Sequence, residues 1–287
     1  MNNFNFLLEK VPPTILKMTD EQYDEIKAIR SSNLKWMLRS PSKFLYHFNN
    51  PKPSTEAMNL GKVFHKAMLE KDLFLNSYIV EPDFGDCRTK LNKEARDLWR
   101  LQNQSKIILK QDQYDCLIGM VNSMGNNSKA MSFLSRGIAE QGCYVNDKAT
   151  GIAIKGKPDF VSSNGEIMID IKTTRDCEED YFQRAIYNYE YHFQSAHHAN
   201  ALSQVTGIKV KFHVIIAVEN IAPFDCQVYL LKKAAIDYGV DRVEMCLRKI
   251  RQCIDSGNFK KEETIKEADL PAYAYLKDQD ETEEEIN

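Results

Sequence analysis

The chain has 287 residues, and its 38 lysines and arginines against 41 aspartates and glutamates give a formal net charge of −3 at pH 7. This length is sufficient for a large buried core, and the absence of a run of about eighteen apolar residues excludes a membrane-spanning helix. The seven cysteines are scattered without a Cys-x-x-Cys pair, which argues against zinc or iron–sulfur ligation and favours reduced thiols.

The charge is unevenly distributed along the chain. The segment from Asp278 to Asn287 holds six acids and no bases, so the rest of the chain has 35 acids against 38 bases. We therefore expect a mildly basic folded body and a disordered acidic tail over residues 278–287. The first residues carry neither a basic segment nor a long apolar one, which predicts a cytoplasmic protein without a secretory signal.

The N-terminal part is predicted to form short helices after an extended or irregular segment. Two adjacent prolines block a helix over residues 1–18. Thr19 is a good N-cap, which predicts a helix that continues to about Ile29. Ser31 or Ser32 can cap the helix that follows.

A Ser-Pro-Ser step predicts a further helix that begins at Ser40. Proline is favoured at the first position of a helix, and the N-terminus of a helix can bind phosphate through its N–H groups. Two interpretations remain open here. Either Arg39, Ser40 and Ser42 form a phosphate site, or the segment is a helical cap whose role is packing.

Residues 54–71 are predicted to form an amphipathic helix, because apolar side chains recur on one face. Gly61 inside this helix costs about 1 kcal/mol relative to alanine, which indicates a close approach by a neighbouring element. His65 lies one turn further along on the same side. A single histidine on a helix is usually structural, so the local pattern does not assign it a function.

Alternation and helical periodicity predict the remaining elements. Residues 77–135 hold one short strand and three helices, near 77–80, 90–101, 111–124 and 127–135. The β core begins with a strand from Ile138 to Val145 that contains Glu140, and a second strand runs from Ile152 to Val161. Two helices, two buried strands and a long amphipathic helix follow, over 178–187, 189–204, 211–219, 226–231 and 232–256.

The clearest local pattern is a β-hairpin over residues 156–174. Asn164-Gly165 is a strong two-residue turn. The residues after it alternate, with isoleucines on one face and a second set on the other, namely Glu166, Met168, Asp170 and Lys172. With the turn at this position, Asp159 lies directly opposite Asp170.

Two opposed carboxylates repel each other, because side chains that face one another across antiparallel strands are about 4.5–5.5 Å apart. A hard divalent cation shared by Asp159 and Asp170 would remove this repulsion. Lys172 leans to the same side, and an ammonium group beside a metal-bound water suits the hydrolysis of a phosphodiester. The alternative is an ordinary polar hairpin face in which these residues occur by chance.

Pro158-Asp159 followed by Asp170-Ile171-Lys172 resembles the core motif of the PD-(D/E)xK nuclease superfamily. The wider context resembles the exonuclease VIII (RecE-type) family of phage and prophage recombination exonucleases, up to a closing segment at residues 270–273. The resemblance implies an α/β fold with a central mixed sheet of about five strands, flanked by helices, and a helical N-terminal region. It also implies three parts, an extension at 1–30, the nuclease domain at 31–277 and the tail at 278–287.

The same resemblance assigns roles to residues outside the hairpin. The spacing of Gly61, Phe64 and His65 matches a helix motif in which the histidine is a metal ligand. Glu140 matches an acid at the active-site cleft, and both a metal- or water-holding role and a structural role remain open for it. On the helix at 189–204, a Tyr-x-x-Gln pattern is matched by Tyr191 and Gln194, whereas His198 departs from the Gln-x-x-x-Tyr element of RecB-type nucleases.

The activity that the resemblance implies is that of a Mg²⁺-dependent 5′→3′ exodeoxyribonuclease, with Mn²⁺ as a substitute ion and two ions per site. One ion would be held by Asp159, Asp170 and the Ile171 carbonyl, and the second by His65 and the shared Asp159. Lys172 would orient or deprotonate the attacking water.

The DNA itself would be held by further side chains. Gln194 would position the nucleotide, and Arg175 would bind the 5′-phosphate of the DNA end, as an arginine at a similar place does in lambda-type exonucleases. Additional candidates for contacts with the DNA are Arg39, Ser40 and Tyr191.

The implied partners are linear double-stranded DNA, a single-strand annealing protein that receives the 3′ overhang, and further copies of the chain in a homo-oligomeric ring, a trimer or tetramer. The implied location is the cytoplasm of a bacterial host cell. Two other classes remain open, a catalytically idle DNA-binding scaffold and a RecB- or CRISPR-type nuclease of different polarity.

Overall fold

A five-stranded sheet forms the centre of the computed structural model, which describes residues 4–51, 53–261, 263–265 and 267–270. The strands are Gly137–Ala139 (β4), Phe160–Ser162 (β7), Ile167–Thr174 (β8), Phe212–Glu219 (β9) and Cys226–Leu230 (β10). Their order is β10-β9-β8-β7-β4. Strands β8 and β9 are parallel and the other neighbours antiparallel, so the sheet is mixed, which confirms the predicted fold class.

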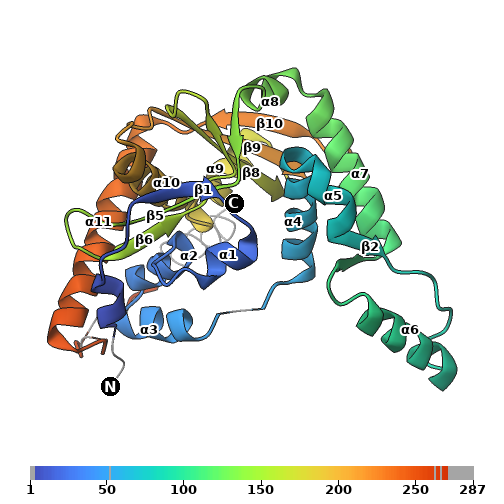
Figure 1. Cartoon of the computed structure of the whole chain (residues 1–287), viewed down its shortest axis with the longest axis horizontal. Helices are drawn as coiled ribbons and strands as arrows, with labels where there is room; N and C mark the ends of the chain where they lie inside the picture. The colour runs from blue at the N-terminus through green and yellow to red at the C-terminus, as the bar shows by residue number, and fades with distance from the viewer. Residues whose placement is uncertain (1–3, 52, 262, 266, 271–287) are drawn as a thin grey trace, which may run out of the picture.

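Helices cover both faces of this sheet (Figure 1). One face packs against Glu56–Leu69 (α4) and Gln111–Asn126 (α7), and the other against Glu179–Asn188 (α9), Tyr191–Thr206 (α10) and Lys233–Ser256 (α11). Successive side chains of a strand point to opposite faces, so Ile169 and Ile171 join the α4 side while Met168 joins the α10 side. The result is a three-layer arrangement.

None of the helices in the described part of the chain combines the length and the apolar character that crossing a membrane requires.

A second, three-stranded sheet consists of Thr14–Lys17 (β1), Gln141–Asn146 (β5) and Ala153–Gly156 (β6), with β5 in the middle. The prediction of one strand from Ile138 to Val145 is therefore wrong, because β4 and β5 belong to different sheets. The predicted strand from Ile152 to Val161 likewise divides into β6 and β7. The chain leaves one sheet for the other at Glu140, whose φ is 56°, and again at Pro158, which has no N–H to donate to a ladder.

The hairpin of β7 and β8 has the predicted register. Phe160 pairs with Ile169, and one step further along the same register places Asp159 opposite Asp170. The turn differs from the prediction, because the strands end at Ser162 and resume at Ile167. Gly165 N donates to the Ser162 carbonyl at 2.8 Å, so the turn lies one residue earlier than expected.

Three short helices follow β1, namely Asp20–Glu25 (α1), Ser31–Leu34 (α2) and Pro41–Asn49 (α3). The predicted start of α1 is confirmed, since Thr19 forms a capping box with Gln22, although α1 ends at Glu25 rather than near Ile29. The proposed capping of α2 by Ser31 or Ser32 is wrong. Arg30 occupies the N-cap position and makes no side-chain capping bond.

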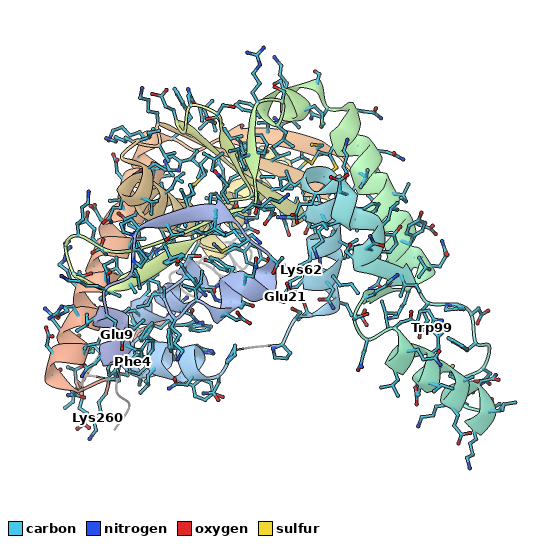
Figure 2. The ribbon with its side chains drawn as sticks, in the orientation of Figure 1. Phe4, Glu9, Glu21, Lys62, Trp99 and Lys260 are labelled. Atoms are coloured by element: carbon cyan, nitrogen blue, oxygen red, sulfur yellow. The ribbon has the colours of Figure 1, made fainter. Side chains whose placement is uncertain are left out.

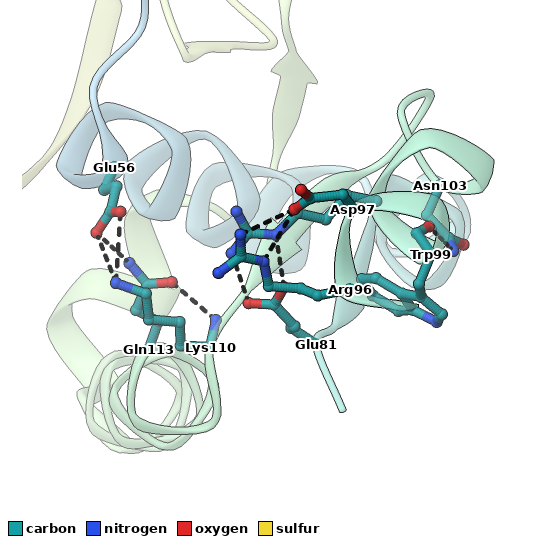
Figure 3. Close-up of polar contacts among 9 residues, drawn as sticks. Glu56, Glu81, Arg96, Asp97, Trp99, Asn103, Lys110 and Gln113 are labelled. Atoms are coloured by element: carbon teal, nitrogen blue, oxygen red, sulfur yellow. Dashed lines mark hydrogen bonds and ion pairs between the residues drawn. The ribbon is translucent and has the colours of Figure 1, made fainter. Parts of the chain in front are cut away.

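Residues 78–110 form an arm that stands away from the sheet (Figure 1). It contains Tyr78–Val80 (β2) and Ile107–Leu109 (β3), which pair in parallel, and Lys90–Gln102 (α6). Within the arm, Arg100 of α6 pairs with Glu81. Figure 3 shows the contacts at the end of the arm, where Glu56 of α4 accepts hydrogen bonds from Lys110 and from Gln113 of α7.

The predicted helices of this region are present as α6, α7 and Ser128–Phe133 (α8). Two elements were not predicted, strand β3 and the short helix Lys71–Ser77 (α5). The predicted tail at 278–287 and residues 271–273 of the closing segment lie outside the described residues, and the domain boundaries at 30 and 277 stay predictions.

The packing of α10 on α11 depends on Gly239. A Cβ added there would lie 2.6 Å from the His192 carbonyl oxygen, so the helices would have to move apart. We expect Gly239→Ala to lower the free energy of unfolding by about 1–3 kcal/mol, measured by chemical denaturation.

Gly125→Ala is the matched control, because Gly125 also lies in a helix but a Cβ there meets open space. It is expected to gain up to about 1 kcal/mol through helix propensity. Equal stabilities for the two variants would contradict the packing argument.

Candidate active site

The two crossings between the sheets bring Glu140 and Asp159 together. Glu140 N donates a hydrogen bond to the Asp159 carbonyl at 2.9 Å, so both crossings lie at the same level. Glu140 has a left-handed backbone, which costs energy for a residue with a side chain. The carboxylates of Glu140 and Asp159 and a ring nitrogen of His65 all lie within 4.8 Å of one another.

Asp159 is held from two sides. One carboxylate oxygen accepts the Ile171 N–H at 2.6 Å, and the other lies 3.5 Å from Nδ1 of His65 on α4. The resemblance placed His65 at this site, and the structure brings it there. A Cβ at Gly61 would meet Thr173 Oγ1 at 3.8 Å, an ordinary contact, so the expected need for a glycine at a close approach is wrong.

Asp170 and Lys172 form a buried ion pair, with 2.5 Å between Lys172 Nζ and Asp170 Oδ2. The Lys172 ammonium also lies 5.2 Å from the ring centroid of Tyr191 on α10, within the range of a cation–π contact. Asp170 Oδ1 is buried and has no hydrogen-bond partner among the described residues. Lys172 is thus fixed on two sides, whereas one oxygen of Asp170 lacks a partner.

The surroundings shift the pKa values of Asp170 and Asp159 in opposite directions. Burial raises the pKa of Asp170 to about 6, and the charge of Asp159 adds to this effect against the attraction of Lys172. Burial acts on Asp159 as well, but His65, Lys172 and the Ile171 N–H outweigh it and hold the pKa of Asp159 well below its usual range. The pKa of Lys172 lies above its usual range, because the attraction of Asp170 and Asp159 outweighs burial.

A second ammonium group, which the sequence analysis did not identify, lies beside this cluster. Lys157 Nζ is 2.7 Å from the Glu140 carboxylate and 2.6 Å from that of Asp20 on α1. Burial, followed by the charge of Asp159, raises the pKa of Glu140 to about 7 despite Lys157. The position of Lys157 directly before Pro158-Asp159 was a usable signal, whereas Asp20, 137 residues away, carried none.

A cleft of about 800 Å³ between α1, α4 and α10 is lined by His65, Glu140, Lys157 and Asp159. Asp170 and Lys172 lie outside its lining, behind Asp159. From α10, Gln194 and His198 face it, as the resemblance implied for Gln194. Burial, followed by the neighbouring His197 and Lys172, lowers the pKa of His198 to about 3, so its ring is neutral. The adjacent His197 is also buried and donates a hydrogen bond to the Lys155 carbonyl at 2.9 Å.

All four of the predicted DNA-binding residues, Arg39, Ser40, Arg175 and Tyr191, lie outside the lining of this cleft, although the Tyr191 ring contacts Lys172. Ser40 is buried and caps α3 by accepting the Lys43 N–H at 3.2 Å, while Arg39 is exposed. Arg175 is exposed and follows the last residue of β8. It forms no ion pair within the described part of the chain, so it is not occupied by a neighbouring acid.

The donor set fits a divalent metal ion such as Mg²⁺ or Mn²⁺. Carboxylate oxygens are the ligands of hard cations, and an imidazole nitrogen extends the set to Mn²⁺. A buried carboxylate oxygen without a partner is unfavourable, and a cation would satisfy that of Asp170. Glu140, whose role was open, belongs to the compact group with His65 and Asp159.

Comparisons with known proteins bear on the family and the fold of the chain. The model of a family described as a PDDEXK-like domain of unknown function (DUF3799) matches residues 30–264. A candidate exonuclease from Eubacterium rectale aligns with a TM-score of 0.59 and 12% identity, over 89% of this chain and 97% of that chain. A phage-related exonuclease from Haemophilus somnus aligns with a TM-score of 0.29 and 15% identity, over 61% of this chain and 92% of that chain. No curated protein matches the sequence.

The two aspartates are expected to affect stability in opposite directions when no metal is bound. The pKa of Asp170 is about 6 in the fold and near 3.8 when unfolded, so its ionised form destabilises the fold above pH 6, and the effect vanishes below about pH 4. Asp170→Asn removes this unfavourable charge but also the partner of Lys172, so it is expected to raise the unfolding free energy at pH 7 by no more than about 1–2 kcal/mol.

The pKa of Asp159 is lowered, so its ionised form stabilises the fold above about pH 4, and this contribution is lost as the pH falls further. Asp159→Asn is expected to be less stable than the parent at pH 7. Denaturation of both variants in EDTA at pH 7 and near pH 4 measures the two effects. Shifts of the same sign at pH 7 would contradict the assignment.

Proposed function

The chain belongs to the DUF3799 family of PDDEXK-like domains, and we propose that it is a metal-dependent nuclease that hydrolyses phosphodiester bonds in DNA. The observation that carries this proposal is the convergence of Asp159, Asp170 and Lys172 in one cluster, of which Asp159 lines the cleft. An ordinary polar hairpin face would leave these side chains in water. Here they are enclosed, and His65 and Glu140 join them.

The proposed metal is Mg²⁺, with Mn²⁺ as a substitute, bound as two ions that share Asp159. The side chains that would hold it are His65, Glu140, Asp159 and Asp170, with the Ile171 carbonyl as a further ligand. When bound, such ions lower the pKa of a water molecule and polarise a phosphoryl oxygen.

Lys172 and Glu140 are proposed to have different roles in the reaction. Lys172 would donate hydrogen bonds to the attacking water and to phosphoryl oxygens, a role that its raised pKa in the metal-free fold favours over that of the base. Glu140 would hold a metal ion or the water beside it, because it belongs to the compact group with His65 and Asp159. Gln194 and Tyr191 border these groups, where Gln194 would hold the nucleotide.

The finer assignments rest on the resemblance to exonuclease VIII. We propose 5′→3′ digestion of one strand of linear double-stranded DNA, which leaves 3′ overhangs for a single-strand annealing protein. The enzyme would work as a homo-oligomeric ring in the cytoplasm of a bacterial host cell. The acidic tail at 278–287 would lie outside the nuclease domain.

Digestion of end-labelled linear, nicked and circular duplex DNA in Mg²⁺ or in EDTA tests this proposal. We expect linear DNA to lose a 5′ label first, in Mg²⁺ alone, and circular DNA to persist. Earlier loss of a 3′ label would reverse the polarity, and a lack of digestion in every condition would leave a catalytically idle scaffold.

In the same assay Lys172→Ala is expected to lower the rate by about 100- to 10,000-fold, because the donor beside the scissile phosphate is lost. Lys209→Ala is the matched control, since Lys209 is exposed and outside the cleft. Near-full activity of Lys172→Ala would remove Lys172 from the mechanism.

The 5′-phosphate clamp is a separate prediction. Arg175 lies three residues after Lys172, exposed and without an ion-pair partner in the described part of the chain. An arginine can hold two phosphate oxygens at once. We expect the parent enzyme to digest duplexes with a 5′-phosphate faster than those with a 5′-hydroxyl, and Arg175→Ala to lose this preference.

Arg136→Ala is the control for that experiment. Arg136 is also exposed, but its carbonyl accepts the Ser163 N–H, so it lies at the opposite end of β8, beside the hairpin turn. An unchanged preference in Arg175→Ala would rule Arg175 out and direct attention to Arg39 and Ser40.

A further inference from the structure

The mouth of the cleft has an acidic wall and a basic wall. α1 contributes Asp20, Glu21 and Asp24, and α4 contributes Lys62 and Lys66. Figure 2 shows Glu21 of α1 and Lys62 of α4 facing one another across the space between the two helices. Carboxylates in the mouth of a cleft oppose the entry of a polyanion, so an acidic wall is unexpected in an enzyme that takes up DNA.

Asp20 is the residue through which α1 meets the positive groups. Its carboxylate lies 2.6 Å from Lys157 Nζ. Burial raises the pKa of Asp20, but Lys157, Lys62 and Lys66 outweigh burial and lower it. Asp20 is therefore ionised, and its charge lies where the fields of three lysines overlap.

The core of the fold does not account for this arrangement. Tyr23 is the one buried residue of α1, and the helix precedes the residues that match the family. Lys155 of β6 holds its C-terminal end, because Lys155 Nζ donates hydrogen bonds to the carbonyls of Tyr23 and Ile26 at 2.5 and 2.8 Å. α1 is thus attached at its C-terminal end by Lys155 and at its N-terminal end through β1, and its acidic first turn lies at the cleft.

We propose that Lys62, Lys66 and Lys157 bind phosphate groups of the DNA strand, and that the carboxylate of Asp20 occupies the phosphate position at Lys157 until the strand displaces it. This proposal rests on the function proposed above. Carboxylate and phosphate oxygens are equivalent acceptors for an ammonium group, so displacement exchanges one ion pair for another. A short anion gains little from the exchange, whereas a strand that engages several lysines at once gains from each.

Binding of a short fluorescent DNA duplex in EDTA, where metal-dependent cleavage does not occur, tests this proposal by anisotropy over a range of salt concentrations. Asp20→Asn is expected to tighten binding by about three- to tenfold at low salt. Asp20→Asn is also expected to steepen the slope of log affinity against log salt by about one, because Lys157 gains a phosphate contact.

Glu25→Gln is the matched control. It removes the same charge from the same helix, but Glu25 is exposed and does not line the cleft. We expect it to change affinity by less than about twofold, with the slope unchanged. Circular dichroism and thermal melting verify that each variant folds.

Lys157→Gln added to Asp20→Asn is expected to cancel most of the gain, since the two residues form one pair. A gain of equal size from Glu25→Gln, or one that persists without Lys157, would assign the effect to net charge and overturn the proposal. Duplex binding by the parent that Asp20→Asn does not tighten would overturn this inference alone. A lack of duplex binding by every variant would overturn the proposed function as well.

Discussion

Two carboxylates buried next to each other, those of Asp159 and Asp170, impose the constraint on which the site depends. Like charges removed from water are unfavourable unless opposite charges and hydrogen bonds accompany them. The fold provides both. His65 and the Ile171 N–H serve Asp159, and Lys172 serves Asp170. Because these partners come from different elements, the site exists only when the hairpin and α4 are assembled.

The same constraint explains why the strands are interrupted at Glu140 and at Pro158. If the strands continued without a break through Glu140 and Asp159, these side chains would point to one or other face of the sheet. Helices cover both of those faces. The left-handed backbone at Glu140 and the proline before Asp159 end the ladders at one level instead. The carboxylates of Glu140 and Asp159 therefore lie beside His65 at a cleft rather than in an apolar layer. The backbone strain at Glu140 is located at the site that uses it.

The sequence predicted what depends on neighbours in the chain. The alternation of β8 and the turn before it determined the register that opposes Asp159 and Asp170, and a shift of the turn by one residue did not change that register. The break at Glu140 was not predictable, because Gly137–Asn146 reads as one strand pattern and a positive φ at glutamate leaves no mark in the sequence. His65 was assigned through the resemblance, since one histidine on a helix carries no periodic signal.

Lys157 and Asp20 could not be paired in advance for a related reason, because an ion pair between residues 137 positions apart follows no period. Their pairing nevertheless distinguishes the role of Lys157 from that of Lys172. Lys172 is enclosed between Asp170 and Tyr191, both within the region that matches the family, and it moves little without disrupting the site. Lys157 pairs both with Glu140 and with Asp20, which lies on α1 outside that region. The first arrangement suits a group that must keep its place during the reaction, and the second suits one that exchanges partners when a strand enters.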